Sequence, residues 1–256
     1  MAIHPTAIID AKAELASDVD VGPYSIIGPD VSIDSGTRID GHVVIRGPSE
    51  IGKNNQFYSF SSIGEACQDK KYRGEPTKLI VGDHNVIREY VTLHRGTAQD
   101  RGETRMGHHN WIMAYVHIAH DCVVGNHTVF ANNATLAGHV TVGDGVILGG
   151  FTGVHQFCQI GAYSMAGMFS VINMDVPAFV MVSGHPAATH GLNVEGMRRR
   201  GDSPALIRQL KDAYKIVYRQ GLTLKEALLQ LQKLPASEQL KLFMTSLEHS
   251  KRGIVR

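Results

Sequence analysis

An apolar residue, mostly Leu, Ile or Val, stands at every sixth position through most of the first 177 residues. One run extends from Ile3 to Ile63, and the period returns at Val81. After a shift of one residue it continues from Met106 to Ile172. An α-helix repeats about every 3.6 residues and a lone strand about every two, so neither explains a period of six. A short strand followed by a corner, repeated many times, does.

Such a repeat predicts a mainly β fold, a parallel β-helix shaped as a triangular prism, over residues 1–190. Three six-residue units close one coil, so residues eighteen positions apart stack about 4.8 Å apart along the axis. Each coil buries its apolar side chains against the coils above and below it. The repeats amount to nearly nine coils, which gives a prism roughly 40 Å tall.

Two breaks in the period predict external loops, near residues 66–78 and 99–105. In the first break the expected apolar positions are Asp69 and Glu75, which are unsuited to the core. In the second, one extra residue shifts the phase. Loops on a rigid scaffold often carry binding residues. The first loop combines Gln68, Asp69, two lysines and Tyr72, which favours a functional role over a tolerated insertion.

Residues 191–256 lose the period of six and predict a small C-terminal α-helical domain. Ser203 and Pro204 fit a cap and first turn, and apolar residues then follow at helical spacing. Thr223 and Glu226 fit a capping box that opens a second helix. A last helix contains Leu240. Short amphipathic helices need a packing partner, either each other or the prism.

Composition limits the possible compartments and partners. The formal net charge is +1, which gives no general reason to expect nucleic acid, and no stretch is apolar enough to span a bilayer. The N-terminus enters the first repeat directly and lacks the apolar core of a signal peptide. Cys122 and Cys158 stack two coils apart, about 9.6 Å, beyond disulfide reach. We therefore expect a cytoplasmic protein whose cysteines pack in the core.

One column of the predicted prism carries chemistry. His120, Gly138 and Gln156 are eighteen positions apart and so lie one above another. Histidine titrates near neutrality and suits a general base, while a glycine N–H can approach a substrate closely because no side chain intervenes. The spacing therefore places a base beside a donor for an oxyanion.

Several segments carry a specific resemblance. They are Ala119–Cys122, Ala131–His139, Val154–Cys158, Gln68–Tyr72, Leu93–Gly96 and Gly191–Gly196. Together they resemble the UDP-N-acetylglucosamine O-acyltransferases that open lipid A synthesis, and the resemblance covers the whole chain. It implies a left-handed β-helix and a cytoplasmic homotrimer with active sites between subunits. It also implies transfer of a 3-hydroxyacyl chain from acyl carrier protein to the 3-hydroxyl of UDP-N-acetylglucosamine, with no cofactor.

The resemblance also assigns residue roles. His120 matches the general base, Asp121 the carboxylate that orients it, and Gly138 the residue whose N–H meets the thioester oxygen. No metal ligand is implied. The matches to substrate-binding residues are Gln68, Asp69, Lys71, His117, His139, His155, Gln156, Asn193, Glu195 and Arg199.

In part of the family, a glycine at one position admits a long acyl chain; this sequence has Met168 at that position. It follows His120 by forty-eight residues, which corresponds to an axial rise near 13 Å. An extended alkyl chain advances about 1.3 Å per carbon. Met168 is therefore predicted to stop a chain of roughly ten carbons, although methionine is also an ordinary gap-filling residue.

Other readings of the same prism are possible. A zinc carbonic anhydrase would use three histidines at a subunit interface. His117, His120, His139 and His155 are candidates, but their spacing does not resemble that family, and the nucleotide-sugar segment would be unexplained. A coenzyme A-dependent acetyltransferase or the related N-acyltransferase of the same pathway is a nearer alternative. The latter carries an additional N-terminal domain. A purely structural role for the solenoid would leave the column of His120 and Gly138 unexplained.

Overall fold

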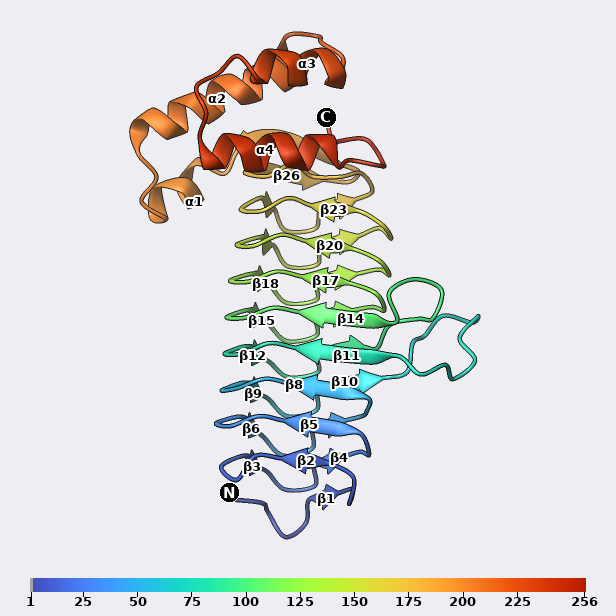
Figure 1. The fold of residues 1–256 in the computed structure, drawn as a ribbon. Coiled ribbons are helices and arrows are strands. Elements are labelled where there is room, and N and C mark those ends of the chain that lie inside the picture. Colours follow the sequence, from blue (N-terminus) through green and yellow to red (C-terminus); the bar gives the residue numbers. More distant parts are fainter. Residues whose placement is uncertain (1) are drawn as a thin grey trace.

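The computed structural model describes residues 2–256 as a long prism with a helical region at one end (Figure 1). Three sheets form its faces. Face 1 contains β1 (Ile8–Ile9), β4 (Ile26–Ile27), β7 (Val44–Ile45), β10 (Ser62–Glu65), β13 (Thr92–His94), β16 (His117–Ile118), β19 (Thr135–Leu136), β22 (Gly153–Val154) and β25 (Val171–Ile172). Face 2 contains β2 (Glu14–Leu15), β5 (Val31–Ile33), β8 (Ser49–Ile51), β11 (Lys78–Val81), β14 (Glu103–Met106), β17 (Val123–Val124), β20 (Thr141–Val142) and β23 (Gln159–Ile160).

Face 3 ends in the one antiparallel pair among the described strands. It contains β3 (Asp20–Val21), β6 (Arg38–Ile39), β9 (Gln56–Phe57), β12 (Val86–Ile87), β15 (Trp111–Ile112), β18 (Val129–Phe130), β21 (Ile147–Leu148), β24 (Met165–Ala166), β26 (Val180–Gly184) and β27 (Ala187–Leu192). β26 pairs in parallel with β24, whereas β27 pairs antiparallel with β26. The predicted parallel β-helix, which is left-handed, is confirmed.

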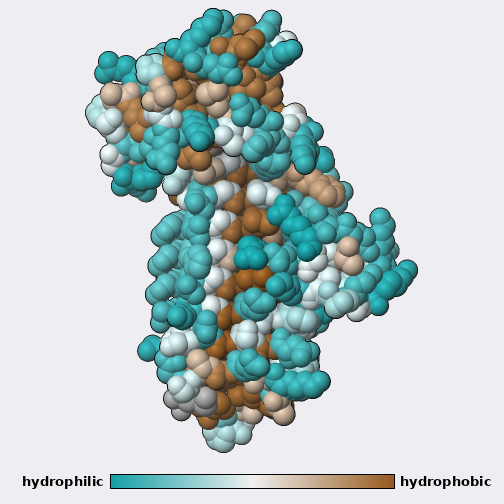
Figure 2. Space-filling view, viewed as in Figure 1, coloured by the Kyte–Doolittle hydropathy of each residue, from teal (hydrophilic) through white to brown (hydrophobic). Residues whose placement is uncertain are grey.

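The register follows the eighteen-residue step that the sequence predicts. Ile118 pairs with Leu136, and Leu136 pairs with Val154. Where a loop is inserted the step lengthens, so that Ser62 pairs with Thr92. The periodic side chains point inward and are buried from Val21 onward, whereas Ile9 and Leu15 in the first coil are partly buried. On the surface, hydrophilic columns flank a hydrophobic stripe that runs along the prism axis (Figure 2).

The corners of the coils hold the side chains that matter for the site. Many corner residues adopt positive φ although they are not glycine, and the ladder of backbone hydrogen bonds between coils holds them there. Their side chains stack from coil to coil. At the edge between faces 3 and 1, Tyr90 lies on Phe60 and Tyr115 on Tyr90, with ring centroids 5.2 and 4.8 Å apart. Asp121 and His139 occupy the same type of corner, between faces 1 and 2.

Both predicted loops project from this prism (Figure 1). The first connects β10 to β11, and its Gln68, Asp69 and Lys71 side chains are exposed. The second connects β13 to β14 and ends at Gly102; the prediction of a loop over residues 103–105 was wrong, because they begin β14 and pair with β11. The two loops contact each other, because Tyr72 of the first lies 3.5 Å from the Arg95 guanidinium at the start of the second.

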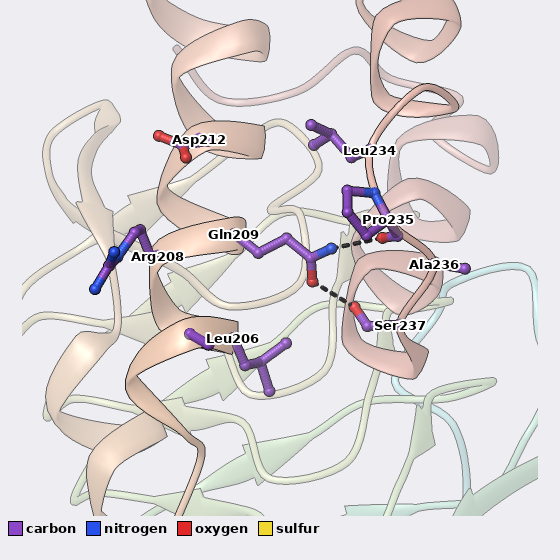
Figure 3. Close-up of a pocket in the computed structure, with 9 residues that line it drawn as sticks. Leu206, Arg208, Gln209, Asp212, Leu234, Pro235, Ala236 and Ser237 are labelled. Atoms are coloured by element: carbon purple, nitrogen blue, oxygen red, sulfur yellow. Dashed lines mark hydrogen bonds between the residues drawn. The ribbon is translucent and has the colours of Figure 1, made fainter.

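The helical region comprises α1 (Val194–Arg199), α2 (Pro204–Arg219), α3 (Leu224–Leu231) and α4 (Glu238–Glu248). Ser203 caps α2, and Thr223 with Glu226 forms the predicted capping box of α3. In the groove between α2 and the start of α4, Gln209 donates to the Pro235 carbonyl and accepts from Ser237 at 2.8 Å (Figure 3). Within residues 2–256, no helix has both the length and the apolar character that crossing a bilayer requires.

Asp175 ties the helical region to the last coil. The residue is buried, and its carboxylate accepts hydrogen bonds from the backbone N–H groups of Gln159, Lys251 and Arg252 and from the hydroxyl of Ser250. Backbone hydrogen bonds run in both directions between Asp175 and the C-terminal tail. The tail after α4 is therefore fixed to the prism.

Candidate active site

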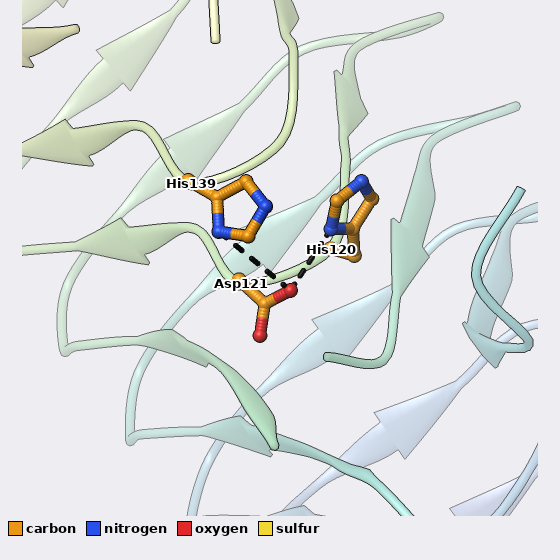
Figure 4. Close-up of side chains that lie close together, drawn as sticks. All are labelled: His120, Asp121 and His139. Atoms are coloured by element: carbon orange, nitrogen blue, oxygen red, sulfur yellow. Dashed lines mark hydrogen bonds and ion pairs between the residues drawn. The ribbon is translucent and has the colours of Figure 1, made fainter. Parts of the chain in front are cut away.

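His120 and Asp121 form a hydrogen-bonded pair at the corner between faces 1 and 2. His120 Nδ1 lies 2.9 Å from Asp121 Oδ2 (Figure 4). The imidazole is 15% exposed and the carboxylate is fully buried. A carboxylate that accepts from Nδ1–H leaves a lone pair on Nε2, so the neutral ring can take a proton from a substrate.

The second loop holds Asp121 in place. The backbone N–H of Thr97 donates to both carboxylate oxygens, and the Thr97 hydroxyl donates to Oδ2 at 2.6 Å. The Asp121 N–H donates to Thr104 Oγ1 at 2.8 Å. Burial alone would raise the pKa of Asp121, but the hydrogen bonds from His120 and Thr97 outweigh it and lower the pKa. The group facing His120 is therefore an ionised carboxylate.

Gly138 lies directly against the His120 ring. A Cβ at position 138 would be 2.5 Å from Cε1 and 2.6 Å from Nε2 of His120, so a side chain and the imidazole cannot occupy this space together. In residues 2–256 the Gly138 N–H has no hydrogen-bond partner, whereas its carbonyl accepts from Phe157. The predicted stacking of Gly138 on His120 is therefore found in the structure.

His139 completes the cluster (Figure 4). Its ring centroid is 4.9 Å from that of His120, and the two rings are nearly perpendicular. His139 Nδ1 lies 2.7 Å from Asp100 Oδ2 and 3.9 Å from Asp121 Oδ2. Asp100 belongs to the second loop, and the sequence did not point to it.

His117 lies apart from this cluster, on the outer side of β16. Its Nδ1 shares a hydrogen bond of 2.7 Å with the Thr92 hydroxyl, and its ring packs edge-on against His94. Burial, reinforced by the charges of His94 and His120, lowers the pKa of His117 from 6.5 to about 4. His117 is therefore neutral at physiological pH and acts as a hydrogen-bonding group.

The ligand atoms of His120, Asp121 and His139 all lie within 4.8 Å of one another, which is a geometry that a metal site would also need. The zinc alternative, however, requires three histidines. Of the four candidate histidines, this cluster contains His120 and His139, whereas His117 is hydrogen-bonded to Thr92. The hydrogen-bond donors around Asp121 favour a hydrogen-bonded His120–Asp121 pair over a metal site.

A second group of candidate residues lies elsewhere. Asn193, Glu195 and Arg199 line a cavity of about 730 Å³ together with Ile147 and Met165, which project outward from face 3. Face 3 is opposite the corner that carries His120. Within one chain, the two groups of predicted site residues are therefore not brought together.

Known proteins provide an independent comparison. A family profile described as domain 2 of UDP-N-acetylglucosamine O-acyltransferase matches residues 175–255, and a bacterial hexapeptide-transferase profile matches residues 103–138. The acyl-[acyl-carrier-protein]–UDP-N-acetylglucosamine O-acyltransferase of Stutzerimonas stutzeri is 58% identical over 255 residues, which is 99% of each chain. The same identity and coverage hold for the enzyme of that name from Thiobacillus denitrificans.

This chain belongs to the UDP-N-acetylglucosamine O-acyltransferase family. The solved structure of the Moraxella catarrhalis family member superposes with a TM-score of 0.98, at 53% identity and full coverage of both chains. The Francisella novicida family member gives 0.97 at 38% identity, covering 99% of this chain and 94% of the other. The predicted resemblance is confirmed, and the protein is an acyltransferase.

In this acyltransferase the remaining predicted site residues are either exposed or bonded within their own region. His155 and Gln156 are exposed on the coil above His139. Asn193 is nearly buried; its side chain accepts from the Gly196 N–H at 3.0 Å and donates to the Tyr163 carbonyl at 3.2 Å, so it fixes α1 to the prism. Glu195 and Arg199 form an exposed ion pair of 3.2 Å on α1.

Met168 lies at the edge between faces 3 and 1, beside Phe169, and is 64% exposed. It does not contribute to the core of its own chain. Met168 and His120 lie at different edges of the prism.

Sequence reasoning missed three residues that support the acyltransferase site: Thr97, Asp100 and Thr104. All belong to the second break in the period, which was predicted only as an external loop. The signal available was the position of that break, because the loop leaves β13 one coil below His120. The loop folds back onto Asp121 and His139 through contacts that the six-residue period does not predict.

Proposed function

We propose that this protein transfers a 3-hydroxyacyl chain of about ten carbons from acyl carrier protein to the 3-hydroxyl of UDP-N-acetylglucosamine. This reaction is the first step of lipid A synthesis. The observation that carries the proposal is the contact between the His120–Asp121 pair and the N–H-bearing backbone of Gly138. The relatives are named for acyl-[acyl-carrier-protein] and UDP-N-acetylglucosamine, which supports these substrates. We place the reaction in the cytoplasm.

The geometry supports the following sequence of steps. His120 Nε2 takes the proton of the sugar 3-hydroxyl while that oxygen attacks the thioester carbonyl. The carbonyl oxygen becomes an oxyanion that accepts from the Gly138 N–H. The tetrahedral intermediate collapses, the C–S bond breaks, and His120 returns the proton to the departing thiolate. Asp121 keeps Nδ1–H in place and stabilises the imidazolium formed in between. No covalent acyl-enzyme is required.

The complete site, in our proposal, lies between subunits of a homotrimer. The Asn193–Glu195–Arg199 group and His120 lie on opposite sides of one chain, so a neighbouring copy must supply one of them. The edge between faces 3 and 1 carries a column of exposed apolar side chains, including Tyr24, Tyr115 and Phe169, which are 54–60% exposed. This column is interrupted only by His42 and Asn133, and an extended exposed apolar edge of this kind is typical of an interface.

The substrate roles of the exposed loop also belong to this proposal. Gln68, Asp69 and Lys71 project from the prism and form no side-chain contact with His120 in their own chain. We assign them to the substrate that lies between subunits. His117, His139, His155 and Gln156 line the same cleft, and Met168 ends it.

The test is mass spectrometry of the products formed from UDP-N-acetylglucosamine and carrier proteins loaded with 3-hydroxyacyl chains of different lengths. We expect one ester, with the highest rate near ten carbons. Chains well beyond that length used equally well would remove Met168 as the stop. The His120→Ala variant should stay folded and lose activity by at least about a thousandfold. No ester from any donor, or near-normal turnover by that folded variant, would contradict the proposal.

A further inference from the structure

Asp100 reaches out of the second loop to a histidine that the proposed reaction leaves without a defined role. Its Oδ2 lies 2.7 Å from His139 Nδ1, whereas Asp121 Oδ2 is 3.9 Å from the same atom. Asp100 is therefore the hydrogen-bond acceptor of His139. The cluster then contains two histidine–aspartate pairs side by side, His120–Asp121 and His139–Asp100.

Packing fixes the plane of the His139 ring. It stacks on Phe157 with centroids 4.4 Å apart and an interplanar angle of 10°, and its edge meets the His120 ring. A half-turn about the Cβ–Cγ bond leaves that plane unchanged but exchanges the nitrogen and carbon edges of the ring. Stacking therefore cannot select the edge that faces the cleft. The hydrogen bond to Asp100 can, because it requires Nδ1 on the side of the loop.

We propose that Asp100 is a positioning residue for the acyl transfer. It holds His139 as the Nδ1–H tautomer, and the lone pair on Nε2 then accepts a hydrogen bond from a hydroxyl group of the bound substrate. The inference rests on the proposed function for the identity of that substrate. It gives His139 a role distinct from that of His120, namely orientation of a hydroxyl and not removal of its proton.

The hydrogen bonds of the second loop fit this positioning role. Thr97 N–H and hydroxyl bind Asp121, and three residues later Asp100 binds His139. Between them the chain closes a turn, because the N–H of Gly102 donates to the Thr97 carbonyl at 3.0 Å. One short segment, residues 97–102, thus orients the carboxylate of one pair and supplies the carboxylate of the other.

Kinetics of four variants test this role: Asp100→Ala, His139→Gln, the double variant, and Arg101→Ala as the control. Arg101 is the exposed neighbour of Asp100 in the same loop. We expect Asp100→Ala to lower kcat/KM about tenfold and Arg101→Ala to leave it unchanged. Because Asp100 acts through His139, the double variant should be no slower than His139→Gln alone. Additive losses, or a full rate for Asp100→Ala, would overturn the proposal.

A readout without substrate separates this inference from the proposed function. In protein labelled with [15N]histidine, side-chain NMR shifts distinguish Nδ1–H from Nε2–H, and the His139 signals are those missing from His139→Gln. We expect the Nδ1–H form in the unmodified protein, its loss in Asp100→Ala and its return in Asp100→Glu. The same tautomer in Asp100→Ala and the unmodified protein would refute the positioning role, even for an enzyme with another substrate.

Discussion

At the scale of single residues, the candidate site depends on the lack of a side chain at Gly138. The coil spacing brings Gly138 and His120 so close that the backbone of Gly138 packs directly against the His120 ring. In the reaction that we propose, the N–H of Gly138 and Nε2 of His120 would act on the same reacting group, with no flexible side chain between them. Such preorganisation reduces the reorganisation needed when charge develops.

We predict that Gly138→Ala abolishes most activity without unfolding the protein. The methyl group would lie about 2.5 Å from the imidazole and would push the ring out of place. Displacing a reacting group by about 1 Å costs on the order of a hundredfold in rate. Steady-state kinetics and a thermal melt measure the two effects.

Gly28→Ala is the matched control, because a Cβ there meets the Ile45 carbonyl at 3.4 Å, an ordinary contact in a coil far below the site. Equal kinetics for Gly138→Ala and Gly28→Ala would show that the His120 ring can move aside freely.

At the scale of elements, the strands and corners could be predicted and the loops could not. Strand positions follow from a buried side chain every six residues, and stacking follows from parallel register, so the closeness of His120 and Gly138 was accessible before the structure. The contacts of Thr97 and Asp100 were not, because a loop outside the repeat has no register to constrain it. For the same reason Asn193 was predicted as a ligand without its structural bonds to α1 and Tyr163.

The attachment of the helical region gives a prediction at this scale. Asp175→Ala removes the acceptor for the backbone N–H groups of Lys251 and Arg252 and for the Ser250 hydroxyl, so these donors lose their buried partner. Losing charged hydrogen bonds of this kind costs about 3 kcal/mol. We expect amide hydrogen exchange in residues 250–256 to become roughly a hundredfold faster.

Asp212→Ala serves as the comparison for that measurement, because Asp212 forms only an exposed ion pair with Lys215 on α2. Exchange in the tail should be unchanged in this variant. If Asp175→Ala also leaves the tail unchanged, the carboxylate does not anchor it.

At the scale of the whole molecule, a site divided between opposite sides of the prism predicts complementation between inactive variants. His120→Ala and Arg199→Ala should each be inactive alone. In the homotrimer that we propose, co-assembled from both variants, each site would draw His120 from one subunit and Arg199 from the next. About a quarter of the sites should then be intact, provided that subunits mix at random. The measurement is the activity of co-expressed, doubly tagged protein.

Separately purified variants, mixed without reassembly, provide the baseline for that experiment. Activity no higher in the co-assembled protein than in this mixture would place both residues in a site of one chain.

The antiparallel pairing of β27 with β26 also ends the stack of parallel strands on face 3. A stack of parallel coils has no intrinsic length, because its last coil offers the same backbone donors and acceptors as every coil before it. Here the chain turns back on itself along face 3, and the tail covers the end of face 2 through Asp175. The hairpin on face 3 and the tail on face 2 therefore cover the C-terminal ends of these two faces, so that neither ends in a bare parallel coil.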